Sequence, residues 1–579
     1  MCGIAGIYST VHMPELQTQV NVMLQAQRHR GPDNLKANYY NNRVALGHNR
    51  LSIIDLSENA NQPFRSSFER YSIVFNGEIY NYKELRESLS TDFVFRTQSD
   101  TEVLLSAYVK WGKDCLQYLN GMFAFAVYDQ EEDKIFAARD RFGVKPFYYH
   151  DGEGIFLFAS EIKALHAYGV TRTPNERMWA SYLTKGVYSW EGNTFWRGIK
   201  ELPAGHYIEV GPSAEPKTNS WYSFVDSIKK RRKDPEYNSR TFEQHLRVYE
   251  SFLVDAVKLR FRSDVPVGFN VSGGVDSSTL LGVIHQLFPE KKVQAFTFYC
   301  NDERYDELPW VKMLMNQTGR AVHEILLQVD EVPELAEKMT IVQDEPYGGI
   351  PTLAYGKIFK VARELGCIVL LDGQGMDEAW AGYDYYHKES DSTVQGVKTS
   401  PFRPQVLKQA FKEKAYKIQY PEPFDDRMLN MQYRDLFYTK IPRALRFNDR
   451  LSMQYSTELR EPFLDYRLVE YAFALPAEMK VKNSQPKWAL RKLSERYLSG
   501  KITTAPKRPL QTPQREWLTE NLLDWVEEQV IELQSCEWFE KDRLLQEWKS
   551  FKQSEKDNTF FLWQWISISV LQQSIIINK

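Results

Sequence analysis

The sequence of 579 residues lacks several features that mark out particular classes of protein. Its five cysteines are widely spaced and include no Cys-X-X-Cys pair, which argues against a disulfide framework or a zinc site and favours a reducing compartment. No apolar run reaches transmembrane length, and the N-terminal segment lacks the basic and apolar regions of a signal peptide. A formal charge of −3 gives no basic excess for binding nucleic acid. We therefore expect a cytoplasmic protein that binds neither nucleic acid nor a membrane.

The length of the chain and a change of pattern along it predict two domains, because one hydrophobic core rarely grows to this size. Residues 1–210 show short strands with covering helices, which is an antiparallel α+β pattern. Residues 211–240 are polar and rich in charges, and are predicted to be a linker. Residues 241–579 begin with alternating strands and helices, typical of a parallel sheet covered on both faces, and end in a helix-rich part.

The second domain is predicted to be an α/β domain whose ligands bind beyond the carboxyl ends of its strands. Strands are expected at residues 265–271, 293–299, 323–328 and 368–371. Helices are expected at residues 277–287, 309–318 and 352–365.

Cys2 directly follows the initiator methionine. Removal of Met1 would leave a thiol and a free α-amine on one residue, and an α-amine with a pKa of roughly 7.7–8.0 can act as a base at neutral pH. A thiol beside its own base is how an N-terminal nucleophile activates sulfur. Considered alone, a cysteine at this position is more often a small buried residue at the start of a strand.

Cys2 is followed by a series of motifs in order. They lie at residues 30–33 (RGPD), 47–53 (GHNRLSI), 75–81 (FNGEIYN), 99–102 (SDTE), 121–125, 139–143 and 159–161. With these motifs, about the first two hundred residues resemble the glutaminase domain of the class II (purF-type) glutamine amidotransferases, an N-terminal-nucleophile fold. The resemblance implies that glutamine is hydrolysed to glutamate and ammonia through a γ-glutamyl thioester on Cys2.

The residue types in these motifs also fit the recognition of a free amino acid. Arg50 can form a fork to an α-carboxylate, and Glu78 and Asp100 can bind an α-ammonium. The Asn76 side chain and the Gly77 backbone N–H suit an oxyanion hole, although an Asn-Gly pair is also the usual sign of a hairpin turn. Cys2, Asn76 and Gly77 are therefore predicted to be catalytic. The predicted glutamine-binding residues are Arg50, Leu51, Ser52, Ile53, Asn76, Gly77, Glu78 and Asp100.

A Ser- and Gly-rich segment, residues 271–278, lies between an expected strand and an expected helix, where backbone N–H groups and the helix N-terminus can face an anion. It has no Gly-Lys-Ser/Thr of a Walker A loop and resembles the pyrophosphate loop of ATP pyrophosphatases. A turn that caps the helix is the simpler interpretation, and both can hold. The expected ATP-binding residues are Val271, Ser272, Gly273, Gly274, Val275, Asp276, Ser277, Ser278, Phe298, Asp372 and Gly373.

A second motif, residues 372–378, follows another expected strand and should reach the same crevice. Asp276 and Asp377 are hard oxygen donors suited to Mg²⁺ carried by ATP phosphates. Either carboxylate alone would more simply be a surface turn residue.

Motifs at residues 449–453, 458–465 and 487–491 extend the resemblance to nearly the whole chain, which is similar to the glutamine-hydrolysing asparagine synthetases. The resemblance implies ATP and Mg²⁺ as cofactors and the amidation of aspartate through β-aspartyl-AMP. It also implies that Lys487 is a catalytic cation that stabilises the leaving pyrophosphate. Without the resemblance, Lys487 would be interpreted as a lysine on a helix surface.

Two other interpretations stay open. Relatives of the same architecture amidate other carboxylates, including sugar acids and antibiotic precursors. A carrier or assembly protein with a degenerate enzyme fold is disfavoured, because both sets of motifs are intact except at Gln374. Residues 344–352 are expected to shape the acceptor pocket, and ammonia is expected to cross between the domains through an apolar passage. The sequence leaves the oligomeric state open, with a homodimer as one arrangement.

Gln374 is the departure from the family pattern. Many members carry Ser-Gly-Glu-Gly where this chain has Asp372, Gly373, Gln374 and Gly375, and the family's Glu is associated with the adenylated intermediate and its reaction with ammonia. Gln374 occupies this catalytic position, but its amide cannot accept a proton as a general base. We expect Asp372 or a bound phosphate to take over the proton.

Overall fold

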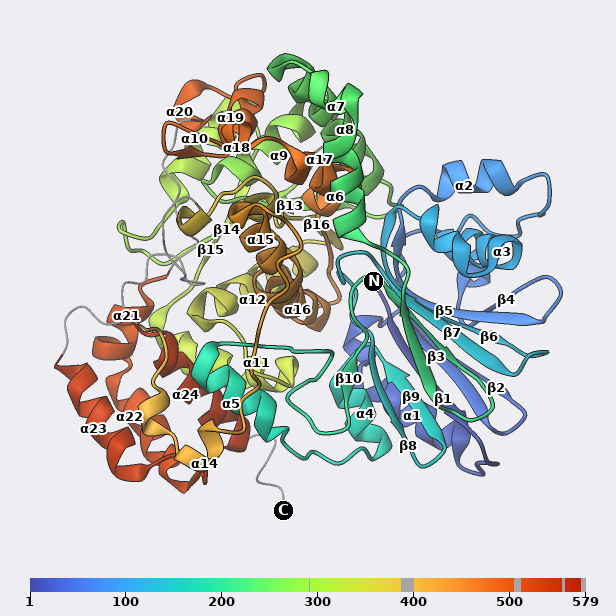
Figure 1. Ribbon diagram of the computed structural model, residues 1–579, viewed down its shortest axis with the longest axis horizontal. Coiled ribbons are helices and arrows are strands. Elements are labelled where there is room, and N and C mark those ends of the chain that lie inside the picture. The colour runs from blue at the N-terminus through green and yellow to red at the C-terminus, as the bar shows by residue number, and fades with distance from the viewer. Residues whose placement is uncertain (291, 387–399, 504–511, 554–557, 574–579) are drawn as a thin grey trace.

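The computed structural model of the chain describes residues 1–290, 292–386, 400–503, 512–553 and 558–573 (Figure 1). In Figure 1 the antiparallel strands of the N-terminal part lie on one side of the molecule, and the parallel sheet with its helices lies on the other. No helix among these residues is both long and apolar enough to cross a membrane.

The first domain contains two antiparallel sheets packed face to face. Its elements are β1 (Gly3–Ser9), α1 (Leu16–Ala26), β2 (Asn34–Tyr40), β3 (Val44–Arg50), β4 (Phe64–Arg65), β5 (Tyr71–Ile79), α2 (Tyr82–Leu89), α3 (Asp100–Trp111), β6 (Gly121–Asp129), β7 (Lys134–Arg139), β8 (Tyr148–Gly152), β9 (Ile155–Ala159), α4 (Ile162–Tyr168), α5 (Glu176–Lys185), β10 (Lys200–Glu201), β11 (His206–Val210) and β12 (Pro216–Ser220). One sheet has the order β10-β8-β9-β1-β3-β2 and the other β12-β11-β7-β6-β5-β4.

The core between these sheets is built from alternate residues of their strands, as the two-residue period of a strand requires. Ile4 on β1, Val74 on β5 and Phe158 on β9 belong to this apolar cluster. Helices α1 and α4 contact the outer face of the first sheet, and α3 contacts β5 of the second. The predicted α+β domain of antiparallel sheets layered with helices is confirmed.

Residues 211–240, predicted to be a linker, carry regular structure. Strand β12 pairs with β11 and so extends the second sheet. Helices α6 (Phe224–Lys233) and α7 (Pro235–Ser239) follow, each with a side-chain cap, from Ser223 and Asp234 respectively. The polar composition of the segment reflects its largely exposed side chains and not a lack of secondary structure.

The second domain is built on a parallel sheet with the order β15-β14-β13-β16-β17. Its elements are α8 (Phe242–Arg260), β13 (Val267–Asn270), α9 (Val275–Leu287), β14 (Ala295–Tyr299), α10 (Leu308–Thr318), β15 (Val322–Leu326), α11 (Val332–Gln343), α12 (Gly349–Glu364), β16 (Val369–Leu371), α13 (Met376–Ala379), α14 (Gln409–Lys412), α15 (Arg427–Arg434), α16 (Ile441–Gln454), β17 (Glu458–Arg460), α17 (Tyr466–Ala474), α18 (Ala477–Lys480), β18 (Val481–Lys482), β19 (Gln485–Pro486), α19 (Trp488–Ser494), α20 (Gly500–Thr503), α21 (Gln514–Glu516), α22 (Leu523–Glu532), α23 (Lys541–Lys552) and α24 (Phe560–Leu571).

Apolar side chains are buried on both faces of the parallel sheet, as expected where helices cover both sides. Val369 and Leu371 of β16 belong to one apolar cluster, and Leu370 between them belongs to another. The chain runs outward from β13 to β15 and then returns to β16 on the other side of β13. Strands β13 and β16 therefore flank a topological switch point, where ligands of open α/β sheets bind. The predicted α/β domain with a helical C-terminal part is confirmed.

Some elements were not expected from the sequence. Strand β17 has only three residues, two of them charged, so it carries no apolar signal of a buried strand. Helix α5 belongs to the N-terminal half of the chain but packs beside α14 (Figure 1). Gln564 on α24 also donates to the carbonyl of Tyr182 on α5 at 2.7 Å. Helices α14 and α24 of the second domain thus contact α5 of the first half of the chain.

Candidate active site

Cys2 is buried just before β1, with 8% of its surface exposed. Its backbone nitrogen donates to Asn76 Oδ1 at 3.0 Å, and its Sγ lies 3.9 Å from the carbonyl oxygen of Leu51. Burial raises the pKa of the Cys2 thiol, although the N-terminal charge, the Leu51 contact and Arg50 lower it. The thiol is therefore largely protonated and needs a base before it can act as a nucleophile.

Asn76 and Gly77 lie within the nine-residue strand β5, so this pair does not form a hairpin turn. A Cβ on Gly77 would stand 2.1 Å from the carbonyl oxygen of Met122 on β6, which leaves room only for glycine. Asn76 is fully buried, and its Nδ2 has no hydrogen-bond partner in the described part of the chain. A buried amide donor without a partner beside Cys2 is suited to a substrate oxygen.

The structure brings the two predicted acidic residues of the glutamine pocket together. Glu78 and Asp100 are both buried, and Asp100 accepts from the backbone N–H of Ile79 at 2.9 Å. Burial raises the pKa of Asp100 to about 6. Burial, Glu458 and Asp100 raise the pKa of Glu78 well above its usual range. Carboxyls whose charge is disfavoured in this way gain most from a bound cation.

Arg50, the predicted carboxylate-binding residue, is held by the loop after β3. Its guanidinium donates to the carbonyl of Ser57 at 2.7 Å and to Asn61 Oδ1 at 2.8 Å. The other predicted residues of this motif, Leu51, Ser52 and Ile53, follow Arg50 directly in the loop after β3. Leu51 and Ile53 are buried, and the Ser52 backbone N–H donates to Asp33 at 2.7 Å.

Met1 is fully enclosed at the junction of the two domains. Its ammonium donates to Glu458 Oε2 at 2.7 Å, with neither group exposed. Lys145 Nζ contacts the Met1 sulfur. Burial opposes ionisation of Glu458, but the Met1 ammonium and Arg460 outweigh it and lower the pKa of Glu458. With Met1 attached, the nitrogen of Cys2 is an amide and cannot act as a base.

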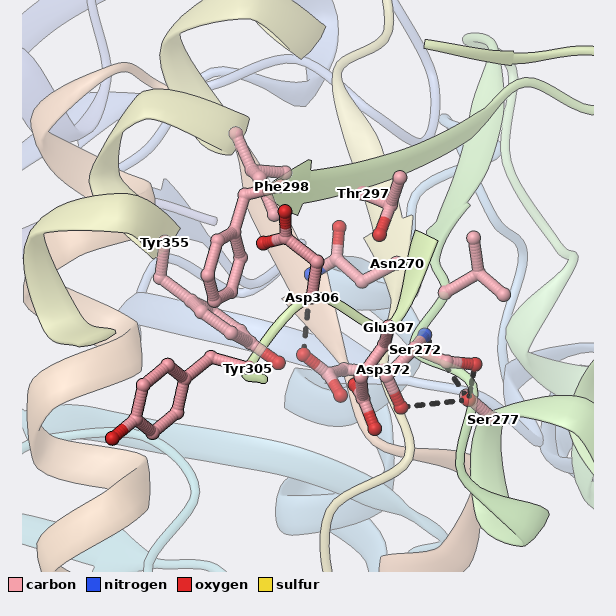
Figure 2. A pocket seen from close by; sticks show the side chains of 12 residues that line it. Asn270, Ser272, Ser277, Thr297, Phe298, Tyr305, Asp306, Glu307, Tyr355 and Asp372 are labelled. Carbon is pink, nitrogen blue, oxygen red and sulfur yellow. Dashed lines mark hydrogen bonds between the residues drawn. The ribbon is translucent and has the colours of Figure 1, made fainter. Parts of the chain in front are cut away.

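A cavity opens at the carboxyl ends of the parallel strands (Figure 2). Its lining residues are Asn270, Val271, Ser272, Ser277, Thr297, Phe298, Tyr305, Asp306, Glu307, Tyr355, Ile358 and Asp372. Figure 2 shows the rings of Phe298 and Tyr355 on one side and Ser272 with Ser277 on the other, with Asp372 between them. This arrangement offers aromatic surface for a ring and hydroxyls and backbone N–H groups for a phosphate.

The Ser277 side chain binds the backbone of Ser272 and so joins the two ends of the predicted phosphate loop. Its Oγ donates to the Ser272 carbonyl at 2.7 Å and accepts from the Ser272 N–H at 3.2 Å. A Cβ on Gly273 would lie 2.6 Å from Trp310 Cβ, so a larger residue would displace the loop. Helix α9 begins at Val275, so Ser277 lies in its first turn. Of the predicted loop residues, Ser278 is buried in α9 and Asp276 pairs with Lys487.

Lys487 joins the two predicted metal ligands. Its Nζ lies 2.6 Å from Asp276 Oδ2 and 2.7 Å from Asp377 Oδ1, and only 3% of the residue is exposed. Burial disfavours the ammonium, but Asp276 and Asp377 outweigh this and raise the pKa of Lys487. A Cβ on Gly382 would stand 1.9 Å from Asp377 Oδ1, so this glycine makes room for the cluster. The two carboxylates form a hard oxygen donor pair of the kind that suits Mg²⁺.

Asp372 and Gly373 lie beside the loop, as predicted. Asp372 accepts from Asn270 Nδ2 at 3.1 Å and from the Gly373 N–H at 2.5 Å, and burial raises its pKa to about 6. A Cβ on Gly373 would approach Ser277 N and Asp276 Cβ at 3.5 and 3.6 Å.

Several residues of this cavity were missed by the sequence analysis. Asp306 accepts from the backbone N–H groups of Cys300 and Asp302 at 2.7 and 3.0 Å and so shapes the loop after β14. The rule that placed Asp372 beyond β16 could have been applied to β14 and would have pointed to this loop. Tyr355 lies on α12, where no local motif marks it.

A second, small cavity lies between the domains. Its lining residues are Tyr80, Asn120, Gly121, Met122, Asp140, Arg141, Phe142 and Val144 of the first domain and Arg260, Glu461, Leu464 and Tyr466 of the second. Nearby, Arg30 of the first domain donates to Asp449 of the second at 2.8 Å. Buried charged pairs therefore fix the two domains against each other around this cavity.

Comparison with known proteins agrees with both halves of this description. Residues 1–222 match the glutamine amidotransferase domain family, and residues 249–573 match the asparagine synthase family. The chain is 31% identical to "Asparagine synthetase [glutamine-hydrolyzing] 3" of Bacillus subtilis, over 91% of this chain and 89% of that protein. It is 28% identical to "Asparagine synthetase [glutamine-hydrolyzing] 1" of the same organism, over 100% of this chain and 97% of that one. It is also 26% identical to "Amidase chyE" of Penicillium rubens, over 89% of each. The chain therefore belongs to the asparagine synthetase family of ATP-using, glutamine-dependent amidotransferases.

Proposed function

We propose that this enzyme makes asparagine from aspartate, with nitrogen taken from glutamine and with ATP split to AMP and pyrophosphate. The observation that carries the proposal is that one chain holds a buried Cys2 beside the Asn76 amide and a cavity beyond β13 and β16. Buried contacts such as that between Arg30 and Asp449 fix the two parts against each other. Aspartate as the acceptor is supported by the two Bacillus subtilis relatives that are named asparagine synthetases and match nearly the whole chain.

In the first half-reaction, we assign the nucleophile to Cys2 after removal of Met1. The freed α-amine takes the thiol proton, and sulfur attacks the side-chain carboxamide of glutamine. Asn76 Nδ2 and the Gly77 N–H stabilise the oxyanion. Ammonia leaves with the proton, and water then hydrolyses the thioester to glutamate. Arg50 binds the α-carboxylate of glutamine, while Glu78 and Asp100 bind its α-ammonium.

In the second half-reaction, the aspartate side chain attacks the α-phosphate of ATP. Val271 and Phe298 flank the adenine, and Ser272 and Ser277, which line the same cavity, face the phosphates together with the backbone of the loop between them. Lys487 stabilises the negative charge of the leaving pyrophosphate. Asp276 and Asp377 would hold Mg²⁺, which would neutralise further phosphate charge.

Ammonia must travel between the two sites without becoming ammonium, which is not a nucleophile. We propose that the cavity between the domains is part of this route. Met122 lines it and lies opposite Glu78 in the β5–β6 pair, so one end adjoins the glutamine pocket. Arg260 and Glu461 also line it, which makes it more polar than the apolar passage expected from the sequence.

A second candidate function is the amidation of another carboxylic acid by the same chemistry. It is favoured by Gln374 and Asp372, which depart from the family pattern, and by similarity to a protein named an amidase. Residues 344–352, expected to shape the acceptor pocket, are partly committed to other contacts, because Glu345 pairs with Arg450 at 3.0 Å.

One experiment separates these candidates. Processed enzyme is supplied with ATP, glutamine and one carboxylic acid at a time, and pyrophosphate release is followed. Aspartate is expected to give the highest kcat/KM. If aspartate fails and another acid succeeds, asparagine is not the product. Absence of both glutamate and pyrophosphate from processed enzyme would instead favour a non-catalytic protein with the same fold.

A further inference from the structure

A carboxyl group lies beside the position where this chain has lost the family's glutamate. Strands β16 and β17 pair in parallel, with Leu371 opposite Arg460, and the Asp372 N–H donates to the Arg460 carbonyl at 2.9 Å. The residues after the two strands therefore run side by side. Glu461 follows Arg460 directly, and its carboxyl faces the backbone of Gln374.

Glu461 has the burial and the vacant acceptor expected of a reactive group. Only 4% of the residue is exposed, and its Oε2 has no hydrogen-bond partner in the described ranges of the chain. Asp372 was expected from the sequence as one candidate acceptor of the proton. Both of its carboxylate oxygens already accept hydrogen bonds, from Asn270 and Gly373. A buried acceptor without a partner is costly to the fold, so it calls for a ligand or a catalytic explanation.

Glu461 also stands between the two sites. On one side it lines the cavity between the domains, together with Met122 of β6. On the other side lies Tyr355, which lines the cavity beyond the parallel sheet. Burial raises the pKa of Tyr355, and the charges of Asp372 and Glu461 raise it further. Of these two carboxyls, Glu461 lines the cavity between the domains, whereas Asp372 lines the cavity beyond the parallel sheet.

We propose that Glu461 is the catalytic base of the amide-forming step and replaces the carboxylate that the family places at position 374. Ammonia forms a C–N bond with the acyl carbon of the acyl adenylate, and the C–O bond to phosphate breaks. AMP leaves with the bonding electron pair, and the surplus proton on nitrogen passes to the Glu461 carboxylate. This inference rests on the proposed function for the acyl adenylate, but not for the identity of the acid.

The surroundings of Glu461 suit this role. Burial and the charge of Asp372 raise the pKa of Glu461 well above its usual range, while Lys145, the Gln374 backbone and Arg260 lower it. A base works best when its pKa lies near the working pH, where it can accept a proton and release it again.

The test compares Glu461→Gln with the wild-type enzyme, both shown by intact mass to lack Met1. Amide formation is expected to fall about 100-fold or more with glutamine and equally with ammonium chloride, the usual effect of losing a general base. Glutamate release and acid-dependent exchange of pyrophosphate into ATP should stay within about threefold, because they precede the lost step. Glu520→Gln, at an exposed carboxyl, is the matched control and should change none of these rates.

A second variant separates catalysis from structure. In Gln374→Glu/Glu461→Gln the carboxyl returns to the family's position, and amide formation is expected to rise at least about tenfold over Glu461→Gln. Wild-type amide formation by Glu461→Gln would overturn the proposal, as would no recovery in the double variant. So would loss of amide formation in Asp372→Asn with none in Glu461→Gln. If aspartate supports no exchange in wild-type enzyme, the proposed function fails instead, and the same ratios are measured with the acid that does support it.

Discussion

The N-terminal ammonium of Met1 lies 2.7 Å from a carboxylate oxygen of Glu458, so the first residue of one domain is paired with a strand of the other. Glu458 is also bound by Arg460, which in turn lies 3.5 Å from Glu78 of the proposed glutamine pocket. Removal of Met1 withdraws one cation from this buried chain of charges. It also creates a new amine on Cys2, at the residue where a base is needed.

Enzyme that retains Met1 is therefore expected to release no glutamate from glutamine. Its Cys2 thiol has a raised pKa and Cys2 has no free α-amine of its own, and losing a general base costs about 10²–10⁴ in rate. Chain made with methionine aminopeptidase inhibited, and checked by intact mass, is compared with processed chain. Ammonium-driven pyrophosphate release serves as the control for folding. Glutamate release at the processed rate from chain of the unprocessed mass would contradict this prediction.

Glutamine capture is expected to weaken in mild acid. The pKa of Asp100 is raised to about 6, so this carboxyl is ionised above that pH and loses its charge as the pH falls through it. Glu78 has a raised pKa too and changes in the same direction. The kcat/KM for glutamate release should therefore fall below about pH 6, where the free enzyme gains these protons.

Asp100→Asn tests which carboxyl is responsible. Loss of a charged hydrogen-bonding partner is worth about 1.5–3 kcal/mol, so kcat/KM should drop roughly tenfold to hundredfold. The remaining acid limb should become shallower, because only Glu78 then titrates. An unchanged profile in Asp100→Asn would remove Asp100 from the recognition of glutamine.

Lys487→Met is expected to stop pyrophosphate release while leaving glutamate release intact. The variant leaves Asp276 and Asp377 facing each other without the cation that lies 2.6 and 2.7 Å from them. Removal of one preorganised electrostatic partner of a transition state costs about 10²–10³ in rate. Lys487→Arg keeps the charge and should recover part of this loss. Pyrophosphate release by Lys487→Met near the wild-type rate would refute the assigned role.

Much of this fold could be predicted from local pattern. The strands β13, β14 and β16 could be predicted because they are buried and largely apolar, and the edge strand β15 because apolar residues flank its His323 and Glu324. Strand β17 was not predicted for the opposite reason, since Glu458 and Arg460 are charged. Their burial depends on partners from several segments: Glu458 pairs with the Met1 ammonium, and Arg460 Nε lies 2.5 Å from Glu458 Oε1. The propensity of a single residue for strands does not reveal such pairing between charged residues.

The candidate site was predictable where its residues are adjacent in sequence, as in Asn76, Gly77 and Glu78. Glu461 was not, because its meaning depends on a neighbour 87 positions earlier in the chain, Gln374, across the pairing of β16 and β17. Gly382 was missed for a similar reason. Only the folded chain brings Lys487 and Asp377 into the space that its missing side chain leaves.

The buried pair between Arg30 and Asp449 is expected to hold the two domains together. Asp449→Asn removes the anion shared by Arg30 and Lys145, which lie 2.8 and 3.5 Å from its carboxylate. Breaking a buried ion pair by removing one partner costs about 3–5 kcal/mol. The Tm of the processed enzyme should therefore fall at neutral pH. Asp542→Asn, at an exposed carboxyl, is the control and should leave the Tm unchanged.

The pH dependence of that loss has a definite sign. Burial opposes ionisation of Asp449, but Arg30 and Lys145 outweigh it, so the pKa of Asp449 is lowered on folding. A lowered carboxyl pKa gives stability that is fully present above the unfolded value of about 3.9 and is lost as the pH falls through the folded value. The difference in Tm between wild type and Asp449→Asn should be constant from about pH 6 to 8 and shrink below about pH 4. A difference that grew toward acid would mean that Asp449 is not ionised in the folded enzyme.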